Sequence, residues 1–356
     1  MANLRDAQTG AAGDEGDRQG PARLSFQASE GFGEWLARQR VGVVFTSKQV
    51  HKIFVCGHND EKAVVVFERT VPGAAGVGAD GRGFWAGTLY QLWRFENALE
   101  AGQASGPFDA IYLPQMAWTT GDIDIHDIST DRHGRPVFAS ALFSCLATTA
   151  SKASFSPLWR PSFVSALAPE NRCFLNGVAM ADGRPRFATV AARTDSEGAW
   201  RDKMRGEGCV IDIDSGEVVA WGLTMPRSPR LVGDRLWLLN SGRTELGFLD
   251  LRRGNWEQVL TLPGYPRGLT IVDQWAVIGL SATRDTVADG GEGEAVAGIV
   301  VADLFKGEIA HRLTIDAPVR EINDIALLPG VRRPGMVGFR SPEIMRQVKI
   351  GDDAEL

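Results

Sequence analysis

Residues 127–140 read DISTDRHGRPVFAS, and residues 176–189 read NGVAMADGRPRFAT. The two segments align without a gap, and their Gly-Arg-Pro triplets, at 134–136 and 183–185, lie 49 residues apart. In both, a tight turn containing Gly leads into a short run rich in apolar residues, which is typical of neighbouring antiparallel strands. A period of this length predicts an array of similar sheet units.

Weaker copies of the same pattern begin near Gly76, Ser228, Arg267 and Asn323, at spacings of 39 to 56 residues. Each unit holds about four strands, which is the size of a propeller blade. The last unit supplies one strand, at 323–328, and residues 41–70 supply three. One strand and three make a complete blade. We therefore predict an all-β, six-bladed β-propeller closed by pairing of its N- and C-terminal strands, with seven blades as the alternative.

The remaining segments are short. Residues 1–28 are rich in Gly, Ala, Asp and Arg, and they predict a disordered N-terminal tail. Residues 29–40 predict a short helix, because Phe32, Trp35 and Leu36 follow helical spacing. The propeller is expected over 41–348, and a C-terminal tail over 349–356.

Composition excludes several classes of protein. The chain carries 38 Lys and Arg against 44 Asp and Glu, a net charge of −6, so neither nucleic acid nor a membrane is expected as a partner. No apolar run approaches the about 18 residues of a spanning helix, and residues 1–25 lack the apolar region of a secretory signal. Four scattered cysteines without a CxxC pair are typical of buried thiols in a reducing compartment, which predicts a cytoplasmic protein.

Familiar catalytic motifs are missing from the sequence. Residues 76–81 match GxGxxG, but a strand follows them where a dinucleotide site needs a helix, so they indicate a turn. The chain contains no GxxxxGK[ST], GxSxG or HExxH.

Polar residues open the predicted innermost strands, and the starts of these strands converge at one end of the central channel. They are His126, Asp127, Asn176, Ser228, Arg230, Arg267, Glu321, Asn323 and Asp324. Carboxylate, amide and imidazole groups facing one pocket can bind a divalent cation or carry out acid–base chemistry. Alternatively, they hydrogen-bond backbone between blades. The loops 193–208 and 283–298 are expected at the same end, the first as a lid containing Trp200 and the second as a mobile segment.

Five segments carry a family resemblance: 90–99 (YQLWRFENAL), 119–128 (TTGDIDIHDI), 142–148 (LFSCLAT), 170–180 (ENRCFLNGVAM) and 225–251 (MPRSPRLVGDRLWLLNSGRTELGFLDL). Over about residues 40–335 the chain resembles a bacterial family of conserved hypothetical proteins, a domain of unknown function regarded as propeller-like. The resemblance implies the fold and no particular activity. In the family pattern, His often stands where this chain has Phe174 and Arg227. The departure argues against a multi-histidine transition-metal site here, and Arg227 favours an anionic ligand.

Two hypotheses follow. In the first, the protein is an enzyme of hydrolase or lyase type acting on a small, anionic substrate. Its catalytic residues would be His126, Asp127 and Asp124, its substrate-binding residues Arg227, Ser228, Arg230 and Arg267, and one divalent cation would lie on Asn176, Asn323 and Asp324. In the second, the propeller is a non-catalytic scaffold that binds a ligand or a protein partner. An open cavity lined by His126, Asp127 and arginines favours the enzyme, whereas acids paired to backbone favour the scaffold.

Overall fold

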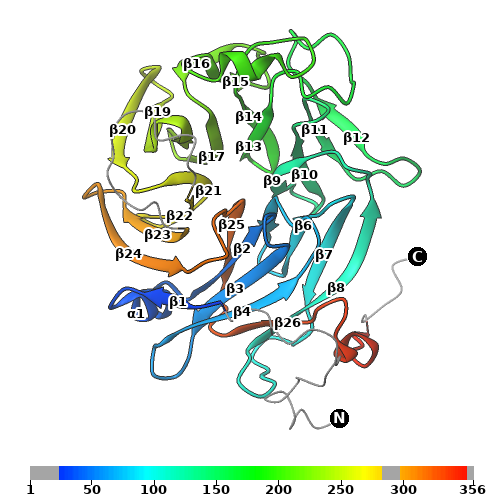
Figure 1. Ribbon diagram of the computed structural model, residues 1–356, viewed down its shortest axis with the longest axis vertical. Coiled ribbons are helices and arrows are strands. Elements are labelled where there is room, and N and C mark those ends of the chain that lie inside the picture. Colours follow the sequence, from blue (N-terminus) through cyan, green and yellow to red (C-terminus); the bar gives the residue numbers. More distant parts are fainter. Residues whose placement is uncertain (1–23, 283–296, 351–356) are drawn as a thin grey trace.

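Six small antiparallel sheets form a ring around a central channel in the computed structural model, which describes residues 24–282 and 297–350 (Figure 1). The six-bladed propeller predicted from the repeat is confirmed. Blades are numbered here in chain order, and the innermost strand of each is named first.

The strand bounds are as follows. Blade 1 contains β25 (Asp324–Pro329), β2 (Val41–Ser47), β3 (Lys52–His58) and β4 (Val64–Thr70); blade 2 contains β5 (Val77–Ala79), β6 (Gly83–Gly87), β7 (Gln91–Asn97), β8 (Ala110–Thr119) and β26 (Pro334–Met336); blade 3 contains β9 (Ile125–Thr130), β10 (Pro136–Ser140), β11 (Cys145–Thr148) and β12 (Ser156–Trp159). Blade 4 contains β13 (Leu175–Ala181), β14 (Arg184–Val190), β15 (Gly208–Asp212) and β16 (Val218–Leu223); blade 5 contains β17 (Pro226–Val232), β18 (Arg235–Asn240), β19 (Glu245–Asp250) and β20 (Asn255–Thr261); blade 6 contains β21 (Tyr265–Val272), β22 (Trp275–Ser281), β23 (Gly298–Asp303), β24 (Glu308–Ile315) and β1 (Phe26–Ala28). The helices are α1 (Phe32–Gln39) and the 3-10 turns η1 (Ala199–Lys203), η2 (Ser241–Arg243) and η3 (Pro342–Met345).

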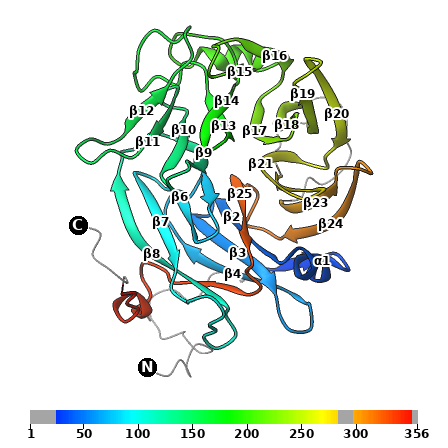
Figure 2. The same cartoon turned by 180° about the vertical axis from the view of Figure 1, so that it is seen from behind.

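Blade 1 closes the ring. Its innermost strand, β25, comes from the end of the chain and pairs antiparallel with β2 from the beginning, from Val41↔Pro329 to Thr46↔Asp324. Figure 2 shows β25 beside β2 from the opposite side of the ring. Because β25 pairs with β2 along its length, β2 is not left as the inner edge strand of blade 1.

The N-terminal end of the chain differs from the expected tail 1–28. Phe26–Ala28, which were assigned to the tail 1–28, form β1 and pair with the outer strand β24, because Phe26 packs its ring edge-on against Phe54 in the core. The helix α1 lies within the expected segment 29–40, and Phe32, Trp35 and Leu36 are fully buried on its inner face. Beyond the last blade, β26 runs parallel to β8 at the outer edge of blade 2. Residues 1–23 and 351–356 lie outside the described part of the chain.

The blade interiors are apolar. All four cysteines are buried and unpaired, as predicted, and burial raises the pKa of each thiol to about 12. In the described part of the chain, no helix is long and apolar enough to cross a membrane.

Glycine allows neighbouring inner strands to approach closely. A Cβ added to Gly78 on β5 would lie 2.2 Å from the backbone oxygen of Ile128 on β9. The GxGxxG match at 76–81 therefore belongs to an inner strand and its turn, as the sequence indicates.

Gly78→Ala is expected to lower the free energy of unfolding by about 2 kcal/mol, because an extra methyl group against fixed backbone forces the two strands apart. Urea denaturation measures this change. An unchanged midpoint would show that the inner strands are not held at this spacing.

Candidate functional site

Bulges at the beginnings of the inner strands set the direction of the polar side chains. On β9, Ile125 pairs with Ser140 and Asp127 pairs with Ala139, so His126 is an extra residue outside the ladder. Asn176 is the corresponding extra residue on β13, and β17 and β21 shift register after Arg227 and Arg267. A bulge bends a strand and redirects the side chain of the inserted residue. Four consecutive blades therefore depart from the regular strand geometry at the same end of the channel, which we call the mouth.

His126 belongs to a chain of three polar side chains in the mouth. Its Nε2 lies 3.0 Å from Oδ2 of Asp124, and the other carboxylate oxygen, Oδ1, lies 3.3 Å from Nζ of Lys48. Lys48 comes from the turn between β2 and β3, so the contact joins blades 1 and 3. Asp124 has a φ of +52°, in the left-handed region, and it lies two residues before the bulged residue His126. Of the two carboxylates named with His126 as catalytic candidates, Asp124 and Asp127, it is Asp124 that lies within hydrogen-bond distance of the ring.

Phe174 is the apolar centre of the mouth. Its ring stacks on Trp200 at 4.3 Å and meets the ring of His126 edge-on at 4.9 Å. The guanidinium carbon of Arg227 lies 5.0 Å from the centre of the same ring, in cation–π contact. Trp200, from the loop 193–208, is only 8% exposed, so this part of the expected lid is packed in place. The loop 283–298 falls almost entirely outside the described residues.

Arg227 is a buried cation without a carboxylate partner among the described residues. It is 7% exposed, and its Nε is buried without a hydrogen bond. Arg267 has one long ion pair, 3.3 Å from its Nη1 to Oε2 of Glu321, and its Nε is likewise buried without a partner. Burial, followed by the charge of Arg227, lowers the pKa of Arg267. Among the described residues, the mouth therefore has guanidinium N–H groups without a hydrogen-bond partner.

The same environment keeps His126 neutral. Burial lowers the pKa of His126, the carboxylate of Asp124 opposes this effect, and the charges of Arg227 and Arg267 lower the pKa further. For Asp124, burial raises the pKa, but His126 and Lys48 outweigh burial and hold it well below its usual range. The ionised carboxylate of Asp124 accepts a hydrogen bond from the Nε2–H group, so the neutral ring has its free lone pair on Nδ1. His126 can therefore accept a proton on Nδ1.

A second layer of charged groups lies next to the mouth on the inner strands. It consists of Asp127, Arg230 and Asp324, and we call it the hub. Asp127 is 1% exposed and accepts two bonds from Arg230, to Oδ1 from Nη2 (2.9 Å) and to Oδ2 from Nη1 (3.1 Å). Oδ2 of Asp127 also accepts a hydrogen bond from the backbone N–H of Val178 in the next blade (3.0 Å). Asp324, equally buried, accepts the N–H groups of Val77 and Ile325 (both 2.9 Å). Burial and the charge of Asp127 raise the pKa of Asp324 well above its usual range. Asp324 thus ties β25 to β5, and Asp127 ties β9 to β13 and β17.

A family model covers most of the propeller. It matches residues 30–337, and its description is a domain of unknown function, DUF4915. The chain belongs to the DUF4915 family. The matched range contains every residue of the mouth and the hub, and no curated protein matches the sequence.

Solved structures similar to this DUF4915 protein share its fold. One, described as the crystal structure of a nidogen/laminin complex, has 13% identity and a TM-score of 0.53, with 82% of this chain and 99% of that chain covered. Another is a protein of unknown function from Bacteroides caccae, with 12% identity, a TM-score of 0.51, and 81% and 98% coverage. At these identities the likeness concerns architecture alone.

The residues predicted as metal ligands in this DUF4915 protein already accept hydrogen bonds within the fold. Oδ1 of Asn323 accepts the backbone N–H of Lys48 (2.7 Å), Oδ1 of Asn176 accepts the hydroxyl of Thr189 (2.9 Å), and Asp324 belongs to the hub. The described residues contain no group of three or more His, Cys, Asp and Glu that could hold a metal ion. The cation on Asn176, Asn323 and Asp324 stays a prediction, and the chemistry below does not use it.

The predicted site residues of the DUF4915 protein thus divide into two layers. His126, Asp124, Arg227 and Arg267 lie in the mouth, whereas Asp127 and Arg230 pair with each other in the hub. Ser228 is buried, with a φ of +49°, within the bulge of β17. Sequence reasoning missed Lys48 and Tyr265, whose ring lies under Arg267 at 5.3 Å. The position of Lys48 follows from the same strand-direction rule, because its turn joins the second and third strands of a blade.

Proposed function

We propose that the mouth binds a small anionic molecule and that His126 exchanges a proton with it or with a water beside it. The observation that carries the proposal is Arg227, which is buried beside Arg267 and has no carboxylate partner among the described residues. A buried guanidinium without a counter-charge costs several kcal/mol. A carboxylate or phosphate group on the ligand would pair with this guanidinium. The free energy spent on burying the charge of Arg227 during folding would then contribute to ligand binding.

Proton transfer would use the free nitrogen of His126. Nδ1 takes a proton from the bound molecule or from an attacking water, and the carboxylate of Asp124 stabilises the imidazolium through Nε2. In the next step, the imidazolium donates this proton to the leaving group, and His126 returns to its neutral form. This is chemistry of the hydrolase or lyase type. Asp127 takes no part, because Arg230 and Val178 occupy its oxygens.

The alternative is a propeller that binds its ligand without catalysis. The backbone bonds of Asp127 and Asp324 favour a structural role for the hub under either function. Binding and turnover therefore need separate tests.

Binding is tested by calorimetry with a panel of inorganic phosphate, phosphate esters and di- and tricarboxylates. We expect at least one to bind the wild-type protein, and Arg227→Gln to weaken that binding by about 30- to 1000-fold, because one partner of a desolvated charge pair is removed. Arg243→Gln is the matched control, since Arg243 is exposed on η2 and its loss changes the net charge equally. Equal binding by the two variants would exclude Arg227 as the anion site.

Turnover is tested with His126→Gln on any anion that the wild-type protein converts. The variant is expected to bind within about threefold of wild type and to lose about 10²- to 10⁴-fold in kcat, which is the usual contribution of a general base. In the wild-type protein, kcat/KM should rise with pH with a midpoint below pH 6.5, because the pKa of free His126 is lowered from 6.5. The midpoint of the kcat profile should lie at a higher pH than that of kcat/KM, because the bound anion offsets the positive charges of Arg227 and Arg267 that lower the pKa of His126. Binding without turnover of any tested anion would favour the non-catalytic alternative.

A further inference from the structure

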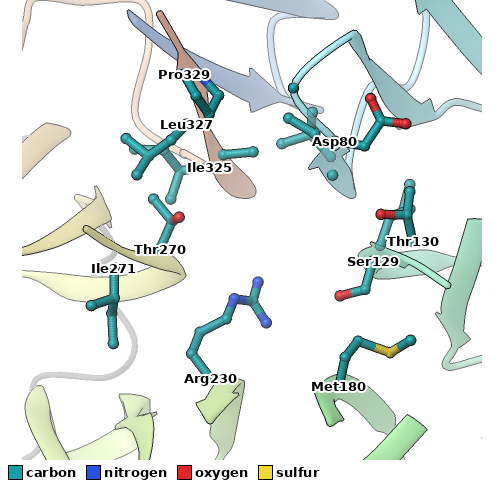
Figure 3. A pocket seen from close by; sticks show the side chains of 16 residues that line it. Asp80, Ser129, Thr130, Met180, Arg230, Thr270, Ile271, Ile325, Leu327 and Pro329 are labelled. Atoms are coloured by element: carbon teal, nitrogen blue, oxygen red, sulfur yellow. The ribbon is translucent and has the colours of Figure 1, made fainter. Parts of the chain in front are cut away.

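The opposite half of the channel contains a cavity of about 480 Å³, separate from the mouth. Its wall is formed by the later residues of the six inner strands, and the polar side chains on it come from Asp80, Ser129, Thr130, Arg230 and Thr270 (Figure 3). Ile128, Met180, Ile271, Ile325 and Leu327 are among the apolar residues of the wall, and no aromatic residue lines it. The volume lies within the range of small-molecule sites.

Arg230 presents one unoccupied edge to this cavity. Its two terminal nitrogens bind Asp127 end-on, and Nη1 also donates to the carbonyl of Pro229 (2.8 Å). The N–H of Nε and the second N–H of Nη2 lie together along the side of the guanidinium plane and have no partner among the described residues. Figure 3 shows the guanidinium extending toward the middle of the cavity. This edge can donate two parallel hydrogen bonds to two neighbouring oxygen atoms.

The charges around the cavity are already balanced. Asp127 neutralises Arg230, and Asp80 is paired with the buried Arg94 at 2.9 Å. An added anion would face the carboxylates of Asp127 and Asp80 without an uncompensated cation. A neutral oxygen-rich molecule meets no such repulsion.

Three hydroxyl groups complete the set of hydrogen-bonding groups. Ser129, Thr130 and Thr270 make no side-chain hydrogen bond within the described part of the chain, and Figure 3 shows Ser129 and Thr270 on opposite sides of Arg230. Each hydroxyl can donate and accept. Such groups match a ligand that carries several hydroxyls of its own, and the apolar residues match its C–H surfaces.

We propose that this cavity binds a neutral polyhydroxylated molecule of monosaccharide size, with two adjacent hydroxyl oxygens on the free edge of Arg230. The site differs from the mouth in place and in ligand charge, so either can fail without the other.

The test is titration calorimetry of the full chain with D-glucose, D-ribose and glycerol, and with D-glucuronate as the charged counterpart of glucose. We expect at least one neutral compound to bind, and Met180→Trp, whose larger side chain narrows the cavity, to weaken this binding by at least about 10-fold. Thr270→Val, which removes one hydroxyl at constant shape, should weaken it by about 5- to 10-fold. Arg227→Gln, at the mouth, should leave it unchanged.

Three results would overturn the proposal. They are no binding of any neutral compound, tighter binding of glucuronate than of glucose, and binding that Met180→Trp does not weaken. Arg230 itself is left unmutated in this test, because its loss would unpair Asp127. Thermal melting of both cavity variants checks that they are folded. If Met180→Trp is not folded, the binding measured with Thr270→Val tests the proposal.

Discussion

A chain that ends at residue 322 is expected to lose cooperative folding. It lacks β25, the innermost strand of blade 1, and with it the six-residue ladder to β2 and the hydrogen bond from the Val77 N–H to Asp324. Blade 1 would then expose β2 as an open edge next to the channel, and the inner strands of blades 2 and 6 would lose their neighbour. Far-UV circular dichroism with thermal melting measures the effect.

The matched control is a chain that ends at residue 340. It keeps β25 and β26 but removes η3 and the exposed side chains of Met345, Val348 and Ile350. We expect this chain to melt cooperatively and close to the full-length protein. Cooperative melting of the shorter chain at the same temperature would contradict closure by the terminal strands.

Arg230→Met is expected to lower the free energy of unfolding by about 3–5 kcal/mol. The substitution leaves the carboxylate of Asp127 buried and without its cation, and an uncompensated buried charge is costly. The double variant Arg230→Met with Asp127→Leu should recover much of this loss, because both charges are removed together. Urea denaturation of the single and double variants gives the coupling energy.

Arg227→Met, three residues away, provides the contrast. Arg227 has no carboxylate partner within the described residues, so its replacement by an apolar side chain should raise the free energy of unfolding. Equal losses for the two arginine variants would show that Arg227 also has a structural partner.

The fold could be predicted from sequence because a propeller repeats its signals. The pair of segments at 127–140 and 176–189 sets the blade length, and a single final strand beside three initial ones requires closure. The strands at the two ends, β1 and β26, could not be predicted. Each has only three residues, and its pairing with β24 or β8 depends on tertiary contacts.

The site was predictable in position and only partly in detail. Strand direction brings His126, Arg227 and Arg267 to one end of the channel although they are far apart in sequence. Strand direction alone does not predict which residue of a strand points into the mouth and which into the hub. The bulge at His126 determines this, and no sequence feature marks the bulge. The partner of Asp127, 103 residues away, was assigned instead to the substrate. The cavity near Met180 carries no signal, since its walls are ordinary strand residues.

The most direct test of the proposed mouth is an NMR titration of the His126 ring in the wild-type protein, with and without the tightest anion of the panel, and in Arg227→Gln. We predict a neutral Nε2–H tautomer with a pKa below 6.5 in the free protein. The pKa should rise in Arg227→Gln, should rise on anion binding, and should stay unchanged in Arg243→Gln. A pKa of His126 that is the same in all four states would contradict a cationic mouth built around this histidine.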